Sequence, residues 1–280
     1  MKALTDNFTV IQITDDFNLR KIAESGQCFR WNHIDDREYR IIYNGKCLYI
    51  TQIAEAEYRI NCDKKEFEMI WKPYFDLGED YGKIRARIDR QRDPFLYFAA
   101  QEEKGVRILR QNSWETLVSF IISQNKNIPA IQKSVELLSQ FSGEKLTDSY
   151  GGFYYAFPTP EEIGKMSEAD LKACKVGYRW KYIKAAANAV LDGTLNLSSL
   201  IPADEKETIQ KLTELYGVGV KVANCVSLYG LHHTDAFPVD VWMKRIIDNE
   251  YSGNYPYERY SPYNGIYQQY MFAYYRKHSS

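Results

Sequence analysis

Three short segments near the N-terminus have the residue pattern of β-strands. Residues 8–13, 38–43 and 46–51 are rich in β-branched and aromatic side chains, which favour pleated, half-buried positions. The last two segments flank Asn44-Gly45, a dipeptide typical of type I′ hairpins because both residues tolerate positive φ angles. This part of the chain therefore predicts an antiparallel sheet.

Beyond Asp93 the apolar residues recur at the spacing of amphipathic helices. Turn and cap residues, such as Ser142-Gly143 and Asp192-Gly193, separate several short helical segments. We therefore expect an α+β fold, in which an antiparallel β-sheet lobe of residues 1–100 precedes a larger all-helical lobe of residues 101–280. The two clearest apolar helix faces consist of Trp114, Leu117, Val118, Ile121 and Ile122, and of Ile128, Ile131, Val135 and Leu138.

The bulk composition excludes several classes of protein. The chain has 280 residues, 45% of them hydrophobic, which is enough for a substantial core. Its five cysteines include no Cys-x-x-Cys pair, which argues against a disulfide framework, a metal site or an iron–sulfur cluster. The segment Met1–Val10 lacks the apolar core of a signal peptide, and no later window resembles a membrane span. We therefore expect a cytoplasmic protein, in the bacterial cytosol or nucleoid, without membrane contact.

The net charge gives no support to nucleic-acid binding. The formal charge is −1, whereas proteins that bind phosphate backbones usually carry a basic footprint. A few positioned amides and cations on one face can nevertheless hold DNA. The charge therefore leaves the question open.

One segment combines a glycine-rich turn with a lysine. Gly217-Val218-Gly219 follows an apolar helix end and precedes Lys221, so free backbone N–H groups would face outward at a helix N-terminus and could grip a phosphate. Nineteen residues after Lys221 lies Asp240, within a Pro-Val-Asp segment. Taken alone, the glycines fit a plain turn equally well, and Asp240 fits a helix cap.

Together these segments resemble the helix-hairpin-helix glycosylase superfamily. Its signature is a glycine-rich hairpin, a lysine two positions after the second glycine and a Pro-Val-Asp segment about twenty residues further on. The resemblance narrows to the 8-oxoguanine DNA glycosylase family through three further blocks, in residues 25–31, 105–111 and 119–128. Because these blocks span both predicted lobes, the resemblance covers nearly the whole chain.

The resemblance implies a bifunctional DNA-repair enzyme that flips 8-oxoguanine out of the duplex. Lys221 would attack C1′ of the extruded nucleotide, and the resulting Schiff base would permit β-elimination. Asp240 would stabilise the cationic sugar and assist proton transfers. We expect no required cofactor and no metal, apart from a monovalent cation that the hairpin carbonyls could hold. The expected partner is double-stranded DNA containing an oxidised purine, bound by a monomer. The alternative for Lys221 is a surface lysine that contacts phosphate.

The resemblance also assigns the pocket for the flipped base. The Gly26 carbonyl would accept a hydrogen bond from N7–H, which 8-oxoguanine has and guanine lacks. Cys225 and Phe272 would sandwich the base, and Gln268 would read its Watson–Crick edge. Without the family match, a turn glycine at Gly26 and core packing for Cys225 and Phe272 would be the simpler interpretations.

A third group of positions matches the family's DNA contacts. Tyr178 would fill the gap left by the extruded base, and Arg179 would hydrogen-bond the orphaned partner. The full set of expected DNA-binding residues is Asn125, Tyr178, Arg179, Gly217, Gly219 and Trp242.

Four positions depart from the familiar eukaryotic members of the family. Ala130 replaces an arginine that reads the opposite cytosine, which removes a bidentate contact and predicts a relaxed opposite-base preference. Lys126 interrupts a run of asparagines, Tyr216 replaces the hairpin proline, and Trp242 replaces a phosphate-contacting histidine.

Two other functions remain open at this point. One is a glycosylase of the same superfamily that acts on another lesion, such as an alkylated purine or a mispaired adenine. Sister enzymes without lyase activity usually lack the hairpin lysine, so Lys221 argues against them. The missing cysteine cluster argues against the branches that contain an iron–sulfur cluster. The other is a non-catalytic helix-hairpin-helix module that binds DNA.

Overall fold

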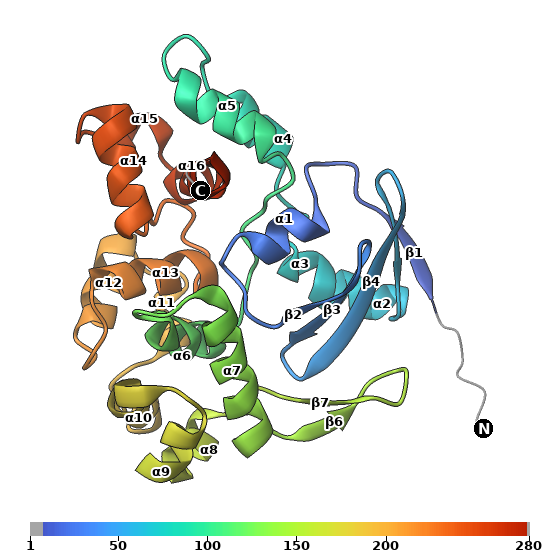
Figure 1. The fold of residues 1–280 in the computed structure, drawn as a ribbon, viewed down its shortest axis with the longest axis vertical. Helices are drawn as coiled ribbons and strands as arrows, with labels where there is room; N and C mark the ends of the chain where they lie inside the picture. Colours follow the sequence, from blue (N-terminus) through green and yellow to red (C-terminus); the bar gives the residue numbers. More distant parts are fainter. Residues whose placement is uncertain (1–7, 279–280) are drawn as a thin grey trace.

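Antiparallel strands in the N-terminal lobe form one five-stranded sheet (Figure 1). The computed structural model describes residues 8–278. The strand order is β1-β5-β4-β3-β2, so every strand except β1 lies beside at least one neighbour in sequence. The strands are β1 (Thr9–Gln12), β2 (Trp31–Asp35), β3 (Glu38–Tyr43), β4 (Lys46–Ala54) and β5 (Glu57–Ile60).

The predicted hairpin joins β3 and β4. Asn44 and Gly45 have φ angles of 48° and 70°, so both occupy the left-handed region that a type I′ turn requires. Tyr43 pairs with Lys46 across this turn, which confirms the prediction. Most of the segment Met1–Val10, interpreted above as lacking a signal peptide, lies outside the described residues.

Short helices accompany the sheet and cover its apolar face. Leu48 and Ile50 on β4 are fully buried, as is Trp71 on the opposing helical segment. The helices before residue 105 are α1 (Leu19–Glu24), α2 (Lys64–Glu66), η1 (Phe67–Trp71), α3 (Lys72–Tyr74), α4 (Tyr81–Ala86) and α5 (Pro94–Glu102).

The second lobe is built around α6 and α13, which pack against each other. The apolar faces predicted for α6 and α7 are buried through Leu117, Ile121, Val135 and Leu138. The helices of this lobe are α6 (Ser113–Ser123), α7 (Ile128–Ser142), α8 (Pro160–Lys165), α9 (Glu168–Ala173), η2 (Gly177–Arg179), α10 (Trp180–Leu191), α11 (Leu197–Leu200), α12 (Glu205–Thr213), α13 (Val220–Gly230), α14 (Val241–Tyr251), α15 (Tyr257–Tyr260) and α16 (Asn264–His278).

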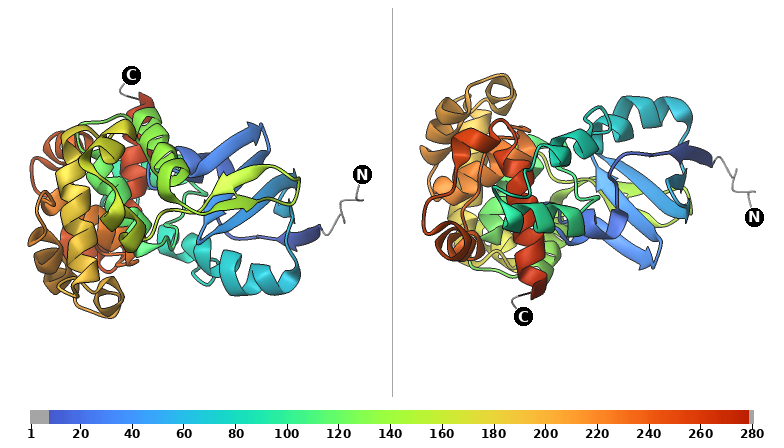
Figure 2. Two further views of the ribbon diagram at one scale, coloured as in Figure 1. Left: turned by 90° about the horizontal axis from the view of Figure 1, so that it is seen from below. Right: turned by 90° about the horizontal axis from the view of Figure 1, so that it is seen from above.

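The expectation that this lobe is entirely helical is wrong in one detail. Two short strands, β6 (Lys145–Thr147) and β7 (Phe153–Tyr155), form a hairpin that extends from α7 alongside the N-terminal sheet (Figure 2). The Tyr154 hydroxyl donates to the Gly45 carbonyl at 3.0 Å, and the Tyr155 carbonyl accepts from buried Arg30. These contacts with the other lobe support strands too short to be stable alone.

Two hydrophobic cores divide the chain near residue 80. Phe75 belongs to the core of the sheet lobe, whereas Tyr81, Ile84 and Leu96 belong to the helical core. The helix α5 lies against α16, so α4 and α5 pack with the helical lobe. The boundary expected between residues 100 and 101 remains a prediction. None of the helices within residues 8–278 is both long and apolar enough to span a bilayer.

Candidate active site

The glycine-rich turn connects α12 to α13 with little space around it. Gly217 has a φ of +84°, and a Cβ there would lie 2.1 Å from the ring of Tyr182. Only glycine fits this position, because both the backbone angle and the contact exclude a side chain. Gly219 precedes α13 in extended conformation, and no side chain caps its helix. The first turn of α13 therefore presents uncapped amides beside Lys221, as a phosphate-binding turn requires.

Lys221 lines a cavity of about 50 Å³ between the two lobes. The structure brings together there all six residues expected to act on the base, although they come from four separate segments. Lys221 and Cys225 belong to α13, Asp240 precedes α14, Gly26 follows α1, and Gln268 and Phe272 belong to α16.

The polar groups of this pocket are positioned by local structure. Asp240 is the N-cap of α14 and accepts a hydrogen bond from the Met243 amide at 2.8 Å, so the capping role is observed. Cys225 is 3% exposed; burial raises the pKa of its thiol, although neighbouring Lys221 opposes the shift. The thiol is therefore neutral at physiological pH. The Nζ atom of Lys221 lies 5.4 Å from the ring centre of Phe120, so this ring is one wall beside the amine.

Gly26 approaches the pocket from the sheet lobe. Its φ is +82°, and a Cβ there would lie 3.5 Å from Ile128 and 3.8 Å from Phe272. These are ordinary contact distances, so the positive φ, rather than a steric clash, favours glycine here. The residue is a turn glycine, and this turn also faces the expected base pocket.

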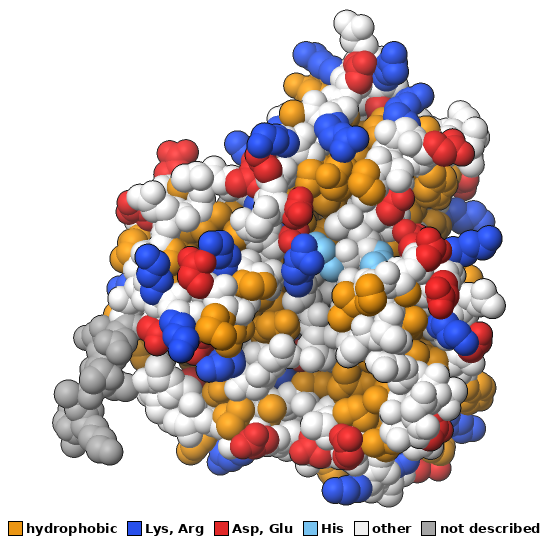
Figure 3. All heavy atoms as spheres, turned by 180° about the vertical axis from the view of Figure 1, so that it is seen from behind, with side chains coloured by type: hydrophobic (Ala, Val, Ile, Leu, Met, Phe, Trp, Pro, Cys, Tyr) orange, Lys and Arg blue, Asp and Glu red, His pale blue; other side chains and the backbone are white. Residues whose placement is uncertain are grey.

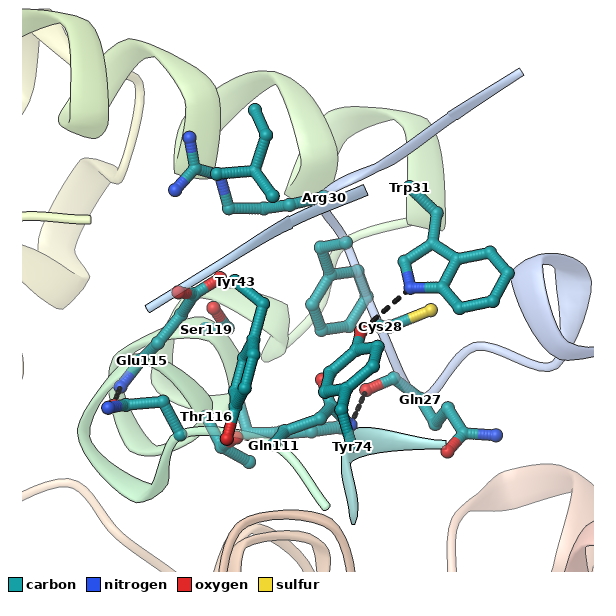
Figure 4. Close-up of a pocket in the computed structure, with 14 residues that line it drawn as sticks. Gln27, Cys28, Arg30, Trp31, Tyr43, Tyr74, Gln111, Glu115, Thr116 and Ser119 are labelled. Atoms are coloured by element: carbon teal, nitrogen blue, oxygen red, sulfur yellow. Dashed lines mark hydrogen bonds between the residues drawn. The ribbon is translucent and has the colours of Figure 1, made fainter. Parts of the chain in front are cut away.

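Residues 103–112 connect α5 to α6 and are called the interlobe segment. Hydrogen bonds to this segment fix the chain just after Gly26 (Figure 4). Buried Gln27 donates to the Arg107 carbonyl and accepts from the Leu109 amide, both at 2.8 Å. The Gln111 side chain donates to the Gln27 carbonyl at 2.8 Å, one of the contacts drawn in Figure 4. The backbone at Gly26 is therefore held relative to the helical lobe.

The helix α16 brings Gln268 into the pocket. Gln268 is 3% exposed, donates to the Pro238 carbonyl at 3.2 Å and accepts from Gln269 at 3.1 Å. At the start of α16, Asp235 accepts hydrogen bonds from the backbone and side chain of Asn264. Asp235 is thus a loop carboxylate that fixes this helix.

Three of the expected DNA contacts, Asn125, Tyr178 and Arg179, lie where the end of α6 meets η2. Tyr178 is 50% exposed, and its hydroxyl accepts a 3.4 Å hydrogen bond from Asn125. Arg179 is only 5% exposed, and its guanidinium donates to the carbonyls of Gln124 and Val176. A contact between Arg179 and an orphaned base therefore stays a prediction that requires these bonds to change.

The departures from the family pattern have identifiable surroundings. Tyr216 is 62% exposed and packs edge-on against Tyr182, with ring centres 5.0 Å apart. Lys126 donates to Ser134 on α7 and to the carbonyl of Lys175, which lies between α9 and η2, so it links its loop to that distant segment. The other two departures lie at helix starts. Ala130 is in the first turn of α7, where its amide donates a hydrogen bond to Asn127. Trp242 is in the first turn of α14, where it packs against Arg245 and Tyr275.

Two family models match consecutive parts of the chain. Residues 10–117 match the model described as 8-oxoguanine DNA glycosylase, N-terminal domain. Residues 118–255 match the HhH-GPD superfamily of base excision DNA repair proteins. The chain belongs to the 8-oxoguanine DNA glycosylase family. The two matches together span both lobes of this family member, including the whole helix-hairpin-helix region.

Related proteins support the family assignment across the fold. The structure of MBOgg1 in complex with a low-affinity DNA ligand is 37% identical, with a TM-score of 0.91 over 98% of this chain and 96% of that one. The Clostridium acetobutylicum 8-oxoguanine glycosylase/lyase, bound to double-stranded DNA with cytosine opposite 8-oxoG, is 34% identical. Its TM-score is 0.88, and the match covers 97% of this chain and 99% of that one. The N-glycosylase/DNA lyase of Saccharomyces cerevisiae is 40% identical over 165 residues, which are 55% of this chain and 44% of that protein.

Several residues that line the pocket of this family member were missed by sequence reasoning. Four of them lie within a block that carries the resemblance or directly beside a residue that was identified, and Tyr229 lies one turn after Cys225 on α13. Proximity to Gly26, Asp240 and Gln268 was the available signal. The additional lining residues are Ser25, Phe120, Tyr229, Pro238 and Gln269.

Proposed function

We propose that this protein is a bifunctional 8-oxoguanine DNA glycosylase and AP lyase. The observation that carries the proposal is the convergence of Lys221, Asp240 and Gly26 on one pocket between the lobes. A nucleophile, a carboxylate and a carbonyl acceptor are the groups that this chemistry requires. The family membership supports the same reaction.

In the proposed reaction, the neutral amine of Lys221 attacks C1′ of the flipped nucleotide. The bond between C1′ and the base breaks, and the base leaves with a proton. Opening of the sugar ring then gives a Schiff base to Lys221, loss of a C2′ proton breaks the C3′–O3′ bond, and water releases the lysine. Asp240 holds positive charge on the sugar as the glycosidic bond breaks. Its backbone hydrogen bond to α14 fixes the carboxylate for this role.

Recognition of the base requires the pocket to open. A cavity of about 50 Å³ has room for only a few water molecules, at roughly 10–15 Å³ each, and a purine is larger. Phe272 is the half-buried wall of this pocket and packs on Arg276, so it is the side chain we expect to move. Gln268 must also exchange its contacts with Pro238 and Gln269 before it can read the base.

Two alternatives make different predictions for the same pocket. A glycosylase for another lesion would excise an alkylated purine or mispaired adenine in preference to 8-oxoguanine. A non-catalytic module would bind DNA through the hairpin without forming a covalent product. The convergence of Asp240, Cys225 and Gln268 on Lys221 favours the catalytic proposal, because DNA binding alone does not need a carboxylate beside a lysine in one pocket.

Borohydride trapping tests the proposal directly. Wild type and Lys221→Gln are incubated with a duplex that contains one 8-oxoguanine, and borohydride reduces any Schiff base to a stable amine. Lys211→Gln is the matched control, because Lys211 is a half-exposed lysine on α12 paired with Glu214. We expect an adduct from wild type and from the control, and none from Lys221→Gln.

Other outcomes assign the alternatives. Excision without an adduct would indicate a glycosylase that uses water as the nucleophile, with Asp240 in the main role. The absence of both excision and an adduct would contradict the proposal. Trapping with duplexes that carry other lesions would then distinguish an enzyme for a different substrate from a non-catalytic module.

A further inference from the structure

A strongly basic segment lies outside the base pocket. Residues 83–92, at the end of α4 and in the loop before α5, contain five cations and one carboxylate. This balance contrasts with the net charge of −1 for the whole chain. Figure 3 shows Lys and Arg side chains gathered at the top of the molecule, where α5 and α15 lie in Figure 1. The charge of this region therefore differs in sign from the molecule as a whole.

Two distant parts of the chain bring three arginines to one hollow. Arg87 and Arg92 come from the basic segment, and Arg259 comes from α15. The hollow has a volume of about 200 Å³, and Tyr260 and Tyr267 form its buried floor. None of these residues lines the pocket that contains Lys221. The arginine hollow is therefore separate from the proposed active site.

The arginines keep most of their hydrogen-bonding capacity. Arg87 lies over the ring of Tyr263 at 5.0 Å and Arg259 lies over Tyr260 at 5.9 Å. Within residues 8–278 neither of them is in an ion pair, and Arg92 alone contacts a carboxylate, that of Asp89 at 3.5 Å. Stacking on a ring orients a guanidinium without using its N–H donors in the plane.

We propose that the arginine hollow binds a phosphate group. The three guanidinium groups that line the hollow outnumber the carboxylates near it, Asp89 in the lining and Asp93 bonded to the hydroxyl of Tyr260, so the local charge favours an anion. The planar donors of arginine match the oxygens of a phosphate in pairs. The phosphate belongs either to the backbone of a nucleic acid, at a distance from the nucleotide bound in the Lys221 pocket, or to a small phosphate compound.

The first experiment uses inorganic phosphate as the probe. Isothermal titration at constant ionic strength compares wild type with Arg87→Gln and Arg259→Gln. We expect saturable binding by wild type, weakened about tenfold or more in each variant, because a hydrogen bond to a charged group is lost. Arg90→Gln is the matched control, since Arg90 is in the same loop but packs on Tyr97 and Phe98 outside the hollow.

A second experiment identifies the source of the phosphate. Affinities are measured for undamaged duplexes of one helical turn, about 10 base pairs, and of about three turns. If a nucleic-acid backbone supplies the phosphate, Arg87→Gln/Arg259→Gln weakens binding of the long duplex and leaves the short duplex unchanged. If a small compound supplies it, the double variant binds both duplexes like wild type while it still loses inorganic phosphate.

Two results would overturn the proposal. One is the absence of saturable phosphate binding by wild type. The other is an equal loss in Arg90→Gln, which would indicate general charge attraction rather than a site. Because inorganic phosphate is the probe, neither result depends on glycosylase activity. Excision of 8-oxoguanine from a short duplex, measured in parallel, should be unchanged in all three single variants.

Discussion

Gly26→Ala separates the backbone strain at Gly26 from its proposed role in damage recognition. The new methyl group would lie 3.5 Å from Ile128 and 3.8 Å from Phe272, so it meets no steric clash. The cost to folding is then that of a positive φ in a residue with a side chain, about 1–2 kcal/mol. For a chain of this size, the cost lowers the Tm by roughly 2–8 °C.

Gly45→Ala provides a control with the same backbone strain at a distant site. Gly45 has a φ of +70°, and its Cβ would lie 3.9 Å from Leu146, the nearest contact. The two variants should therefore lose similar stability. Only Gly26→Ala should affect function, because Gly45 is in the β3–β4 turn and does not line the pocket.

The expected functional loss follows from the hydrogen-bond mismatch. Guanine would place the N7 lone pair against the Gly26 carbonyl, and two unpaired acceptors cost about 1–3 kcal/mol. This energy corresponds to roughly 5- to 150-fold discrimination. A methyl group beside Phe272 narrows the space for the base and moves it away from the carbonyl, so the discrimination should fall toward unity.

The assay compares affinities for duplexes containing 8-oxoguanine or guanine in a Lys221→Gln background, where no base is removed. Excision rates by Gly26→Ala and Gly45→Ala are measured alongside. If Gly26→Ala keeps both the affinity ratio and the excision rate of its parent, Gly26 is not the damage sensor. If Gly45→Ala loses activity to the same extent, lower stability explains the effect.

Three further predictions rest on separate features. Gly217→Ala should destabilise the fold by about 2–5 kcal/mol, because its Cβ would lie 2.1 Å from Tyr182; a loss below about 1 kcal/mol in chemical denaturation would contradict this. Ala130→Arg should increase the preference for cytosine opposite the lesion by about 5- to 150-fold in excision rates; an unchanged preference, or a wild type that already prefers cytosine strongly, would contradict this. Burial alone would raise the pKa of Asp76, but its contacts with His232 and a neighbouring arginine lower the pKa below its ordinary value. Its stabilising effect is therefore complete above about pH 4 and is lost as the pH falls below that value, and Asp76→Asn should flatten the acid side of the Tm profile.

The sequence predicted those features that depend on local spacing. Lys221 and Cys225 are four residues apart, so a helix necessarily places them on one face, and both line the pocket. The Asn44-Gly45 turn and the capping role of Asp240 are likewise properties of a few consecutive residues. The convergence of the lobes on one pocket was accessible only through the family resemblance, because no local rule joins Gly26 to Lys221.

Features that depend on distant contacts could not be predicted. The β6–β7 hairpin is only three residues per strand and is supported by Arg30 and Gly45 of the other lobe. The burial of Arg179 depends on the Gln124 carbonyl, more than fifty residues earlier. The close approach of Tyr182 to Gly217 joins α10 to the turn between α12 and α13, a turn that does not directly follow α10 in the chain.

The buried guanidinium of Arg107 explains how a pocket shared by two lobes keeps its geometry. Arg107 is fully buried and donates to the Asp15 carboxylate and to four backbone carbonyls, among them those of Phe75 and Asp76. A buried charge is tolerated only when such partners satisfy it. Its own carbonyl accepts from Gln27, which directly follows Gly26. The proposed damage sensor is therefore tied to the interlobe segment, while the proposed nucleophile, Lys221, belongs to the helical lobe that this segment enters. With the roles proposed for Gly26 and Lys221, recognition and attack would depend on one another through this buried connection.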